Sequence, residues 1–191
     1  MHAAVSFSNV SRFVACLPAL LVLAEFPAED LSAQERSATV GAMPSPELML
    51  EFKVLRPEGM ADDVAGPVLL ALPPGAQDRA MVEAGQRLYW RDEALRLGWT
   101  VISPIAPDGE RLHGANLPRM LELLDHLEER FTVEGGRVHL AGVSNGGRTA
   151  FELALAKPER FASLTLAPGL PLDVETDFDL ERLRVLKGLP I

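Results

Sequence analysis

A serine flanked by two glycines carries the most specific chemical signal in the sequence. The run from Gly142 to Gly146 reads Gly-Val-Ser-Asn-Gly, and its serine, Ser144, falls between an apolar segment and a helix-like segment. At the tip of a sharp strand-to-helix turn the serine backbone is strained, and side chains two residues before and after it would clash. Gly142 and Gly146 meet that requirement. The pattern predicts an exposed hydroxyl that can act as a nucleophile.

The residue after this serine has a predicted role of its own. The turn places the backbone N–H of Asn145 at the N-terminus of the following helix. An N–H group in that position, together with the helix dipole, stabilises negative charge that develops on a carbonyl oxygen. We therefore expect Asn145 to donate to an oxyanion.

Two other interpretations of this run remain open. In the first, the glycines form an ordinary turn and Ser144 only caps the helix. In the second, Gly142 to Thr149 is a phosphate-binding loop, although Arg148 stands where that motif requires lysine. The segment Leu164 to Pro168 also lacks the aspartate that would hold magnesium. The interpretation of Ser144 as a nucleophile is favoured over both of these.

Alternating strand-like and helix-like segments surround the run. Short apolar stretches bounded by Pro and Gly predict strands, and 3.6-residue periodicity predicts helices. The expected strands cover residues 48–55, 67–72, 99–104, 137–143 and 163–167, with a further strand beginning at 189–191. The expected helices cover residues 79–97, 117–130, 145–157 and 179–187. This order is typical of an α/β fold with a mostly parallel sheet and flanking helices.

Composition limits the cofactors and partners. The 191 residues are 48% hydrophobic and 24% charged, with a net charge of −9, as in a soluble globular domain. No basic block is present, which argues against nucleic acid and anionic membranes as partners. Cys16 is the one cysteine, so a disulfide framework is excluded, and the four histidines lack zinc-site spacing. We expect neither a metal nor an organic cofactor, and the oligomeric state is left open.

The N-terminal residues are typical of a targeting segment. Arg12 is the one charge before an apolar run from Phe13 to Ala24, which contains Pro18 and is short for a transmembrane helix. We expect a signal peptide over residues 1–33, with export to the periplasm or the medium and no stable membrane insertion after cleavage. An uncleaved membrane anchor is the alternative.

Two further segments complete the expected organisation. Residues 34–46 are polar and contain two prolines, which predicts a linker. Residues 47–191 carry the strand and helix signals and are expected to form one globular domain.

Four pieces of this domain, in their order and spacing, resemble the α/β-hydrolase superfamily. They are the strand and loop at Leu70–Gly75, the strand at 101–104, the elbow at 142–147 and the segment Lys157–Phe161. The resemblance extends over residues 67–191, and it is strongest to the phospholipase/carboxylesterase and polyester-depolymerase-like group of exported bacterial esterases. It implies cleavage of small carboxylic esters through an acyl-enzyme at Ser144. A peptidase on the same fold is the alternative.

The resemblance also implies a second oxyanion donor in the loop after the strand at 67–72. Relatives commonly carry His-Gly where this chain has Pro73-Pro74. Proline has no backbone N–H, so neither proline can donate. The implied donor is Gly75 or Ala76, and the sequence leaves the choice between them open.

The acid and the histidine of a catalytic triad are not found in this sequence. The superfamily order is serine, acid, histidine, and no histidine follows Ser144. His139 lies in the same strand as the serine, His126 is expected on the surface, and His113 is expected near the pocket mouth. We therefore expect an α/β-hydrolase domain that is incomplete at its C-terminal side, with the acid and the histidine beyond Ile191. A non-catalytic fragment that only binds a ligand is the remaining alternative.

Several other residues have weaker assignments. Four large side chains could line an acyl pocket, although core packing is the favoured role for most of them: Met81, Tyr89, Trp90 and Trp99. Three aspartates after the serine are expected to be solvated loop charges or a helix cap: Asp173, Asp177 and Asp179.

Overall fold

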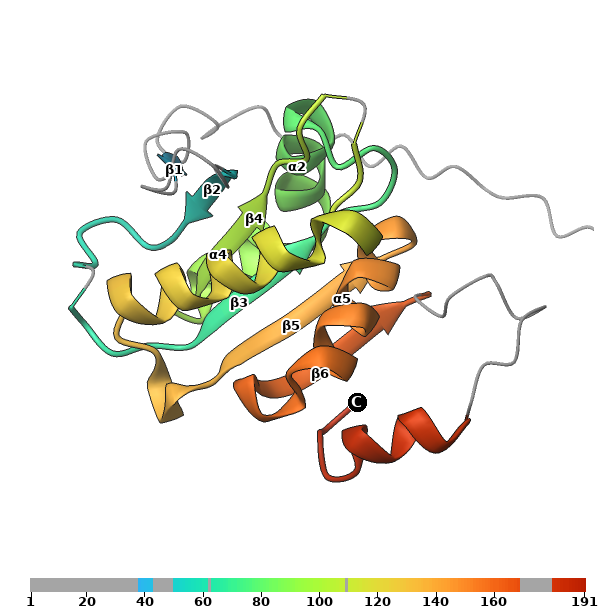
Figure 1. Cartoon of the computed structure of the whole chain (residues 1–191). Coiled ribbons are helices and arrows are strands. Elements are labelled where there is room, and N and C mark those ends of the chain that lie inside the picture. Colours follow the sequence, from blue (N-terminus) through green and yellow to red (C-terminus); the bar gives the residue numbers. More distant parts are fainter. Residues whose placement is uncertain (1–37, 43–49, 62, 109, 169–179) are drawn as a thin grey trace, which may run out of the picture. The chain divides into compact units, whose positions relative to one another are not determined.

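The described residues form a sheet of six strands in the computed structural model (Figure 1). These residues are 38–42, 50–61, 63–108, 110–168 and 180–191, and they belong to one compact unit, Ser32–Ile191. The strands are β1 (Ala38–Ala42), β2 (Glu51–Leu55), β3 (Val68–Leu72), β4 (Thr100–Pro104), β5 (Val138–Val143) and β6 (Phe161–Ala167). Their order across the sheet is β1-β2-β4-β3-β5-β6.

Four neighbouring strands of this sheet are parallel. β4, β3, β5 and β6 run in one direction, and β2 pairs antiparallel with both β4 and β1. Parallel strands are usually covered on both faces, which explains the short, almost wholly apolar runs seen in the sequence. The predicted α/β fold with a mostly parallel sheet is confirmed.

Helices cover both faces of the sheet. They are α2 (Arg79–Gly85), α3 (Arg91–Arg96), α4 (Leu117–Arg130) and α5 (Asn145–Ala156), with a π-helical turn η2 (Gln86–Trp90). Short 3-10 turns are η3 (Gly114–Asn116), η4 (Glu134–Gly136), η5 (Pro158–Arg160) and η6 (Leu180–Leu186). The bounds of α4 are those predicted, and α5 is one residue shorter than predicted.

Two predicted segments contain more structure than expected. The helix predicted over residues 79–97 is present as a continuous helical stretch, in which the π turn η2 separates α2 from α3, because a π turn adds a residue without breaking the apolar pattern. The segment predicted as a linker, residues 34–46, includes strand β1, which pairs antiparallel with β2. The expected signal peptide, residues 1–33, lies outside the described residues, as do Asp173, Asp177 and Asp179.

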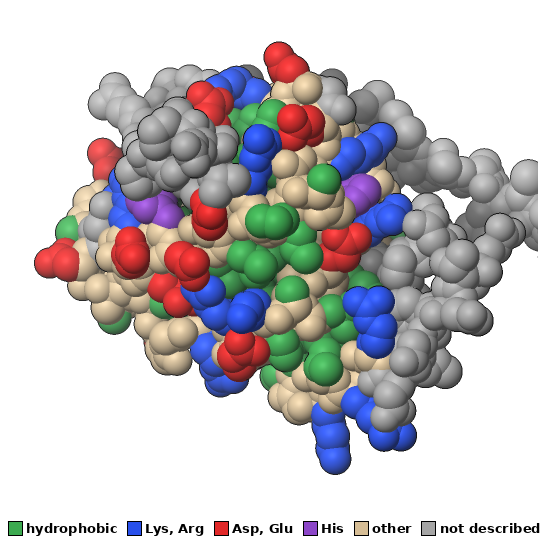
Figure 2. All heavy atoms as spheres, viewed as in Figure 1, with side chains coloured by type: hydrophobic (Ala, Val, Ile, Leu, Met, Phe, Trp, Pro, Cys, Tyr) green, Lys and Arg blue, Asp and Glu red, His purple; other side chains and the backbone are tan. Residues whose placement is uncertain are grey.

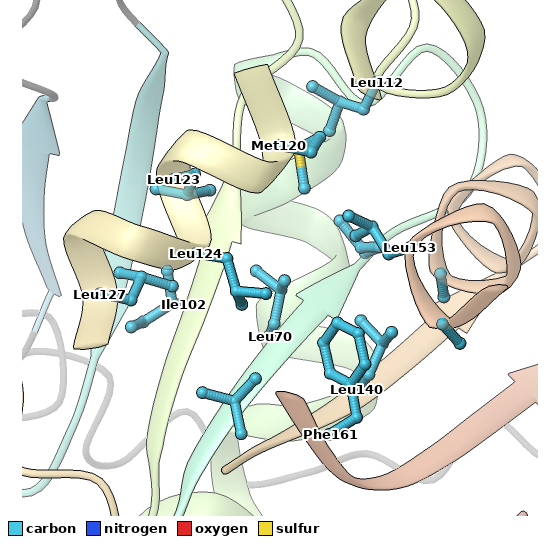
Figure 3. Packing of buried hydrophobic residues seen from close by; sticks show 14 of the residues in the cluster. Leu70, Ile102, Leu112, Met120, Leu123, Leu124, Leu127, Leu140, Leu153 and Phe161 are labelled. Atoms are coloured by element: carbon cyan, nitrogen blue, oxygen red, sulfur yellow. The ribbon is translucent and has the colours of Figure 1, made fainter. Parts of the chain in front are cut away.

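The core follows the pleat of the strands, whose successive side chains point to opposite faces. On one face, Leu70, Ile102 and Leu140 belong to a large buried cluster with side chains from α4 and α5 (Figure 3). On the other face, Ala71 and Val101 form a second buried cluster with residues around α3. The sheet is therefore the middle layer between two layers of helices.

Arg160 fastens the turn after α5 to helix α4. Its guanidinium donates to Glu128 Oε1 at 2.7 Å and to Asp125 Oδ1 at 2.6 Å, and its side chain is 17% exposed. The next residue, Phe161, is fully buried in the large cluster. The Lys157–Phe161 segment thus contributes a polar clamp followed by an apolar anchor. Figure 2 shows Lys and Arg side chains interspersed with those of Asp and Glu over the face in view.

We expect Arg160→Met to lower the free energy of unfolding by about 1–2 kcal/mol, because two charge-assisted hydrogen bonds to half-exposed carboxylates are lost. Urea denaturation measures this change. Arg96→Met is the matched control, since Arg96 and its partner Glu93 are 65% and 71% exposed. The control should cost less than about 0.5 kcal/mol. Equal losses in the two variants would show that the clamp adds nothing to stability.

Candidate active site

Ser144 lies at the tip of the turn between β5 and α5. Its backbone has φ 53° and ψ −115°, and it is one of two non-glycine residues with positive φ among those described. Such a conformation costs on the order of 1–3 kcal/mol and persists only where the surroundings fix it. The strain expected of a nucleophile elbow is therefore present at this serine.

The two flanking glycines allow α5 to start directly against the sheet. A Cβ atom on Gly142 would lie 2.3 Å from the carbonyl oxygen of Gly146. A Cβ atom on Gly146 would lie 2.0 Å from the carbonyl oxygen of Leu72, at the end of β3. Both distances are far inside van der Waals contact, and the atoms met are backbone atoms that cannot rotate away. Only glycine fits at either position.

Main-chain hydrogen bonds hold the serine, and its side chain is left exposed. The Ser144 N–H donates to the carbonyl oxygen of Pro168 at 2.9 Å, just after β6. The Ser144 carbonyl accepts from the N–H of Arg148 at 3.0 Å, which is the first bond of α5. The hydroxyl makes no capping hydrogen bond to the helix, and the residue is exposed. The interpretation of Ser144 as a helix cap is therefore wrong.

The phosphate-loop interpretation also fails on this geometry. Helix α5 begins at Asn145, so Arg148 and Thr149 lie within its first turns. A phosphate-binding loop of that pattern needs an open glycine-rich loop before the helix, with its N–H groups turned toward the phosphates. Here the segment is a tight elbow.

The loop after β3 approaches the elbow through one hydrogen bond. The side-chain amide of Asn145 donates through Nδ2 to the carbonyl oxygen of Gly75 at 2.9 Å. Both candidates for the second oxyanion donor, Gly75 and Ala76, are thereby placed beside the start of α5. Gly75 is half-buried with φ +69°, and Ala76 is exposed.

Gln77 ties the same loop to the segment after β4. It is fully buried with φ 60°, and its carbonyl accepts from the N–H of Ala106 at 2.9 Å. Its side-chain amide has no hydrogen-bond partner among the described residues. Two contacts thus fix this loop, through Gly75 on one side and Gln77 on the other. The side-chain contact of Asn145 and the main-chain contact of Gln77 were not predicted from the sequence, because no motif spacing marks either one.

The three described histidines lie away from the position expected for a general base. His139 stands five residues before the serine in β5, about 16 Å away at the rise of a strand. Its Nδ1 is 2.8 Å from the hydroxyl of Ser163, its ring packs on Trp99, and burial lowers its pKa. His126 is half-buried against Phe52, so its expected surface position was wrong.

His113 lies in the loop that contacts the middle of α5. The neighbouring N–H, that of Gly114, donates to Glu152 at 2.7 Å, two turns along α5 from Ser144. His113 also lines a shallow hollow together with Arg111 and Asn116. Its expected place near the mouth of a substrate pocket stays a prediction.

Met81, one of the four large residues considered for an acyl pocket, lies beside the loop after β3. Its Cε is 3.3 Å from the position that a Cβ on Gly75 would take. Trp90 and Trp99 pack against the second buried cluster, as favoured from the sequence. Tyr89 is 50% exposed and meets the edge of Trp90.

A hollow of about 340 Å³ opens beside this loop, at the carboxyl end of β4. The hollow is lined by residues from the start of β2, the start of α2 and the segment after β4: Leu50, Glu51, Asp78, Arg79, Ile105, Ala106, Pro107 and Asp108. In the part of the chain that the structure describes, no group of three or more His, Cys, Asp or Glu side chains could hold a metal ion. No described helix is long and apolar enough to cross a membrane.

Known proteins resemble this chain in fold and, over a shorter stretch, in sequence. No protein-family profile matches it. The 2-hydroxy-6-oxononadienedioate/2-hydroxy-6-oxononatrienedioate hydrolase of Paraburkholderia xenovorans is 37% identical over 91 residues, which is 47% of this chain and 27% of the relative.

Two solved structures share the arrangement of strands and helices. A thermostable esterase superposes with a TM-score of 0.65 at 16% identity, covering 83% of this chain and 46% of its own. A dipeptidyl aminopeptidase IV of Bacteroides ovatus, itself assigned tentatively, superposes with a TM-score of 0.52 at 17% identity, covering 67% and 20%. The chain thus spans less than half the length of these proteins. At such identities the likeness establishes the fold.

Proposed function

We propose that this chain, which has the α/β-hydrolase fold, carries the nucleophile of a serine hydrolase that cleaves carboxylic esters. The observation that carries the proposal is the strained backbone of Ser144, with φ 53° and ψ −115°, between Gly142 and Gly146. An exposed hydroxyl on an over-determined, strained turn is the arrangement that nucleophilic acyl transfer requires. The similarity to a solved esterase supports the same reaction class.

In the proposed reaction, Ser144 Oγ attacks the ester carbonyl carbon and gives up its proton as the C–O bond to the alcohol breaks. The alcohol leaves with a proton, and the acyl group remains on Ser144. Water then cleaves this acyl-enzyme, releasing the carboxylic acid and restoring the hydroxyl. The N–H of Asn145 donates to the oxyanion formed in both steps, and a second N–H comes from Gly75 or Ala76. No metal or organic cofactor takes part.

The proposed substrate is a small ester. The loop at 73–78 contacts the elbow through Gly75, and both the hollow of about 340 Å³ and Met81 adjoin this loop, which supports a small substrate. The sequence relative is named as a hydrolase of an oxo-diacid, which makes a substrate with carboxyl groups the second candidate. Export to the periplasm or the medium is part of the proposal, and the apolar run at residues 13–24 supports it.

We expect the complete protein, with its triad acid and histidine, to hydrolyse p-nitrophenyl acetate and butyrate with a higher kcat/KM than aminoacyl p-nitroanilides. The reason is that a p-nitrophenyl ester has a better leaving group than a p-nitroanilide, and a serine esterase lacks the added transition-state stabilisation that amide cleavage requires. Steady-state assays with both substrate series measure the ratio. A preference for the anilides would favour the peptidase alternative. Absence of Ser144-dependent reaction with either series would favour the non-catalytic alternative.

A further inference from the structure

An ion pair sets the charge of the hollow beside the loop after β3. We propose that Glu51 is a specificity-determining residue: by neutralising Arg79, it makes the hollow accept esters whose bound arm is neutral or cationic and disfavour esters whose arm ends in a carboxylate. This inference rests on the proposed function, since it concerns the substrate of the same site. It decides between a neutral substrate and one with carboxyl groups.

The wall of the hollow belongs in part to the loop that contacts the elbow. Asp78 lines the hollow and follows Gly75 by three residues, so their Cα atoms are at most about 11 Å apart. The carbonyl oxygen of Gly75 accepts from Asn145, the residue after Ser144, at 2.9 Å. The N–H of Ala106, another lining residue, donates to a carbonyl of the same loop at 2.9 Å. The arm of an ester held at Ser144 that extends along this loop therefore leads into the hollow.

Charged and apolar side chains share the lining of the hollow. The described lining residues include three carboxylates, those of Glu51, Asp78 and Asp108, and one guanidinium, that of Arg79, which gives a net formal charge of −2. Leu50, which is 1% exposed, adds an apolar contact. The hollow thus suits a short hydrocarbon arm and repels a further negative charge.

Arg79 supplies the one positive charge on the described part of this lining, and a carboxylate of the protein is paired with it. Its Nη2 donates to Glu51 Oε2, and the two side chains are 47% and 50% exposed. A guanidinium suits a substrate carboxylate, because its fork of N–H groups matches the two carboxylate oxygens. A substrate with an anionic arm must therefore compete with Glu51 for this group, close to two further carboxylates.

The ion pair can be removed without disturbing the strand and the helix that carry it. The main-chain carbonyl of Glu51 accepts from the N–H of Ile105 at 2.8 Å, and Asp78 caps α2 by accepting from the N–H of Met81 at 2.8 Å. Neither hydrogen bond uses the paired groups. An ion pair with this exposure contributes little to stability. Its main effect is therefore on the charge of the hollow.

The test compares three p-nitrophenyl esters of similar length on the complete protein. The arm of the first ends in a carboxylate (mono-p-nitrophenyl adipate), the second is its neutral methyl ester, and the arm of the third ends in trimethylammonium. We expect kcat/KM to be at least about five-fold lower for the carboxylate than for the methyl ester and highest for the ammonium, mainly through KM. These differences should shrink in high salt. A wild-type preference for the carboxylate would overturn the inference.

Glu51→Gln and Arg79→Met change the charge of the hollow in opposite directions. The first frees the guanidinium, so the ratio of kcat/KM for the methyl ester to that for the carboxylate should fall by about five-fold or more. The second leaves Glu51 unpaired, so the same ratio should rise. A role in folding alone would change the rates with all three esters together and leave the ratio at its wild-type value. Ratios that stay there, or that move in the same direction in both variants, would contradict the specificity role.

Glu93→Gln is the matched control, because it breaks the exposed ion pair with Arg96 on α3 and changes the net charge of the protein by the same amount. Neither residue lines the hollow, so the ratio should stay within about two-fold of wild type. A change as large as that of Glu51→Gln would refute the inference. Ser144-dependent hydrolysis without discrimination by charge would overturn the inference alone, whereas the absence of Ser144-dependent hydrolysis of all three esters would overturn the proposed function with it.

Discussion

Ser144→Ala is expected to abolish covalent labelling by a fluorophosphonate and to lower ester hydrolysis by about 10³-fold or more. The reason is that the acyl group, or the phosphonyl group of the probe, must be bonded to the oxygen that this variant lacks. Mass spectrometry of the intact protein and of its peptides measures the adduct and its position. The fold should be unaffected, since the hydroxyl makes no capping bond to α5.

Ser163→Ala is the matched control for this experiment. Ser163 is the described serine whose hydroxyl lies 2.8 Å from a histidine nitrogen, that of His139. A serine–histidine pair can suggest a nucleophile by itself, but this pair joins directly opposed residues of β5 and β6. We expect labelling to survive Ser163→Ala. Labelling that survives Ser144→Ala and is lost in Ser163→Ala would move the active site to the other end of the strand.

Gly146→Ala is expected to lower the free energy of unfolding by about 3 kcal/mol or more, at the upper end of overpacking effects, because the added atom meets rigid backbone. The added Cβ would lie 2.0 Å from the carbonyl oxygen of Leu72 and 2.6 Å from that of Pro73. Relief requires α5 to move away from β3, which would open the large cluster under the helix. Thermal and urea denaturation measure the loss.

Gly66→Ala controls for the general effect of replacing glycine. Its Cβ would meet nothing closer than the carbonyl oxygen of Gly98 at 3.9 Å, and Gly66 does not have positive φ. The same substitution should therefore leave stability nearly unchanged or raise it slightly. If Gly146→Ala melted within a few degrees of this control, the close packing of α5 on β3 would be disproved.

The parts of the fold that depend on local pattern were predictable from the sequence. The apolar runs that became β3, β4 and β5 are bounded by Pro and Gly, and the leucine stripe of α4 has the period of a helix. Strand β1 and the π turn at Gln86 were not predictable in the same way. The first is a short strand whose pairing depends on β2, and the second is one added residue within a continuous apolar pattern.

In the candidate site, too, the features that are local in the sequence were predictable and those that depend on tertiary contacts were not. Ser144 and its glycines are consecutive in the chain, so the motif itself could suggest the elbow. The contact between Asn145 and Gly75 joins residues that are 70 positions apart, and only the pairing of β3 with β5 brings them together. Likewise, His126 was expected on the surface because α4 has a polar face, but Phe52 from β2 lies against its ring.

The backbone conformation at position 144 does not depend on the side chain there, so catalytic chemistry and fold can change independently in evolution. Among the described residues, the hydrogen bonds that hold Ser144 belong to the main chain, to Ala167 and Pro168 on one side and to Arg148 on the other. A substitution of Ser144 by cysteine, or by a residue without a nucleophilic group, would therefore leave the backbone of the elbow unchanged. Descendants of such a protein could drift from catalyst to binder while remaining superposable throughout. Similarity of fold is therefore weak evidence for catalytic activity, and the identity of the side chain at position 144 is stronger evidence.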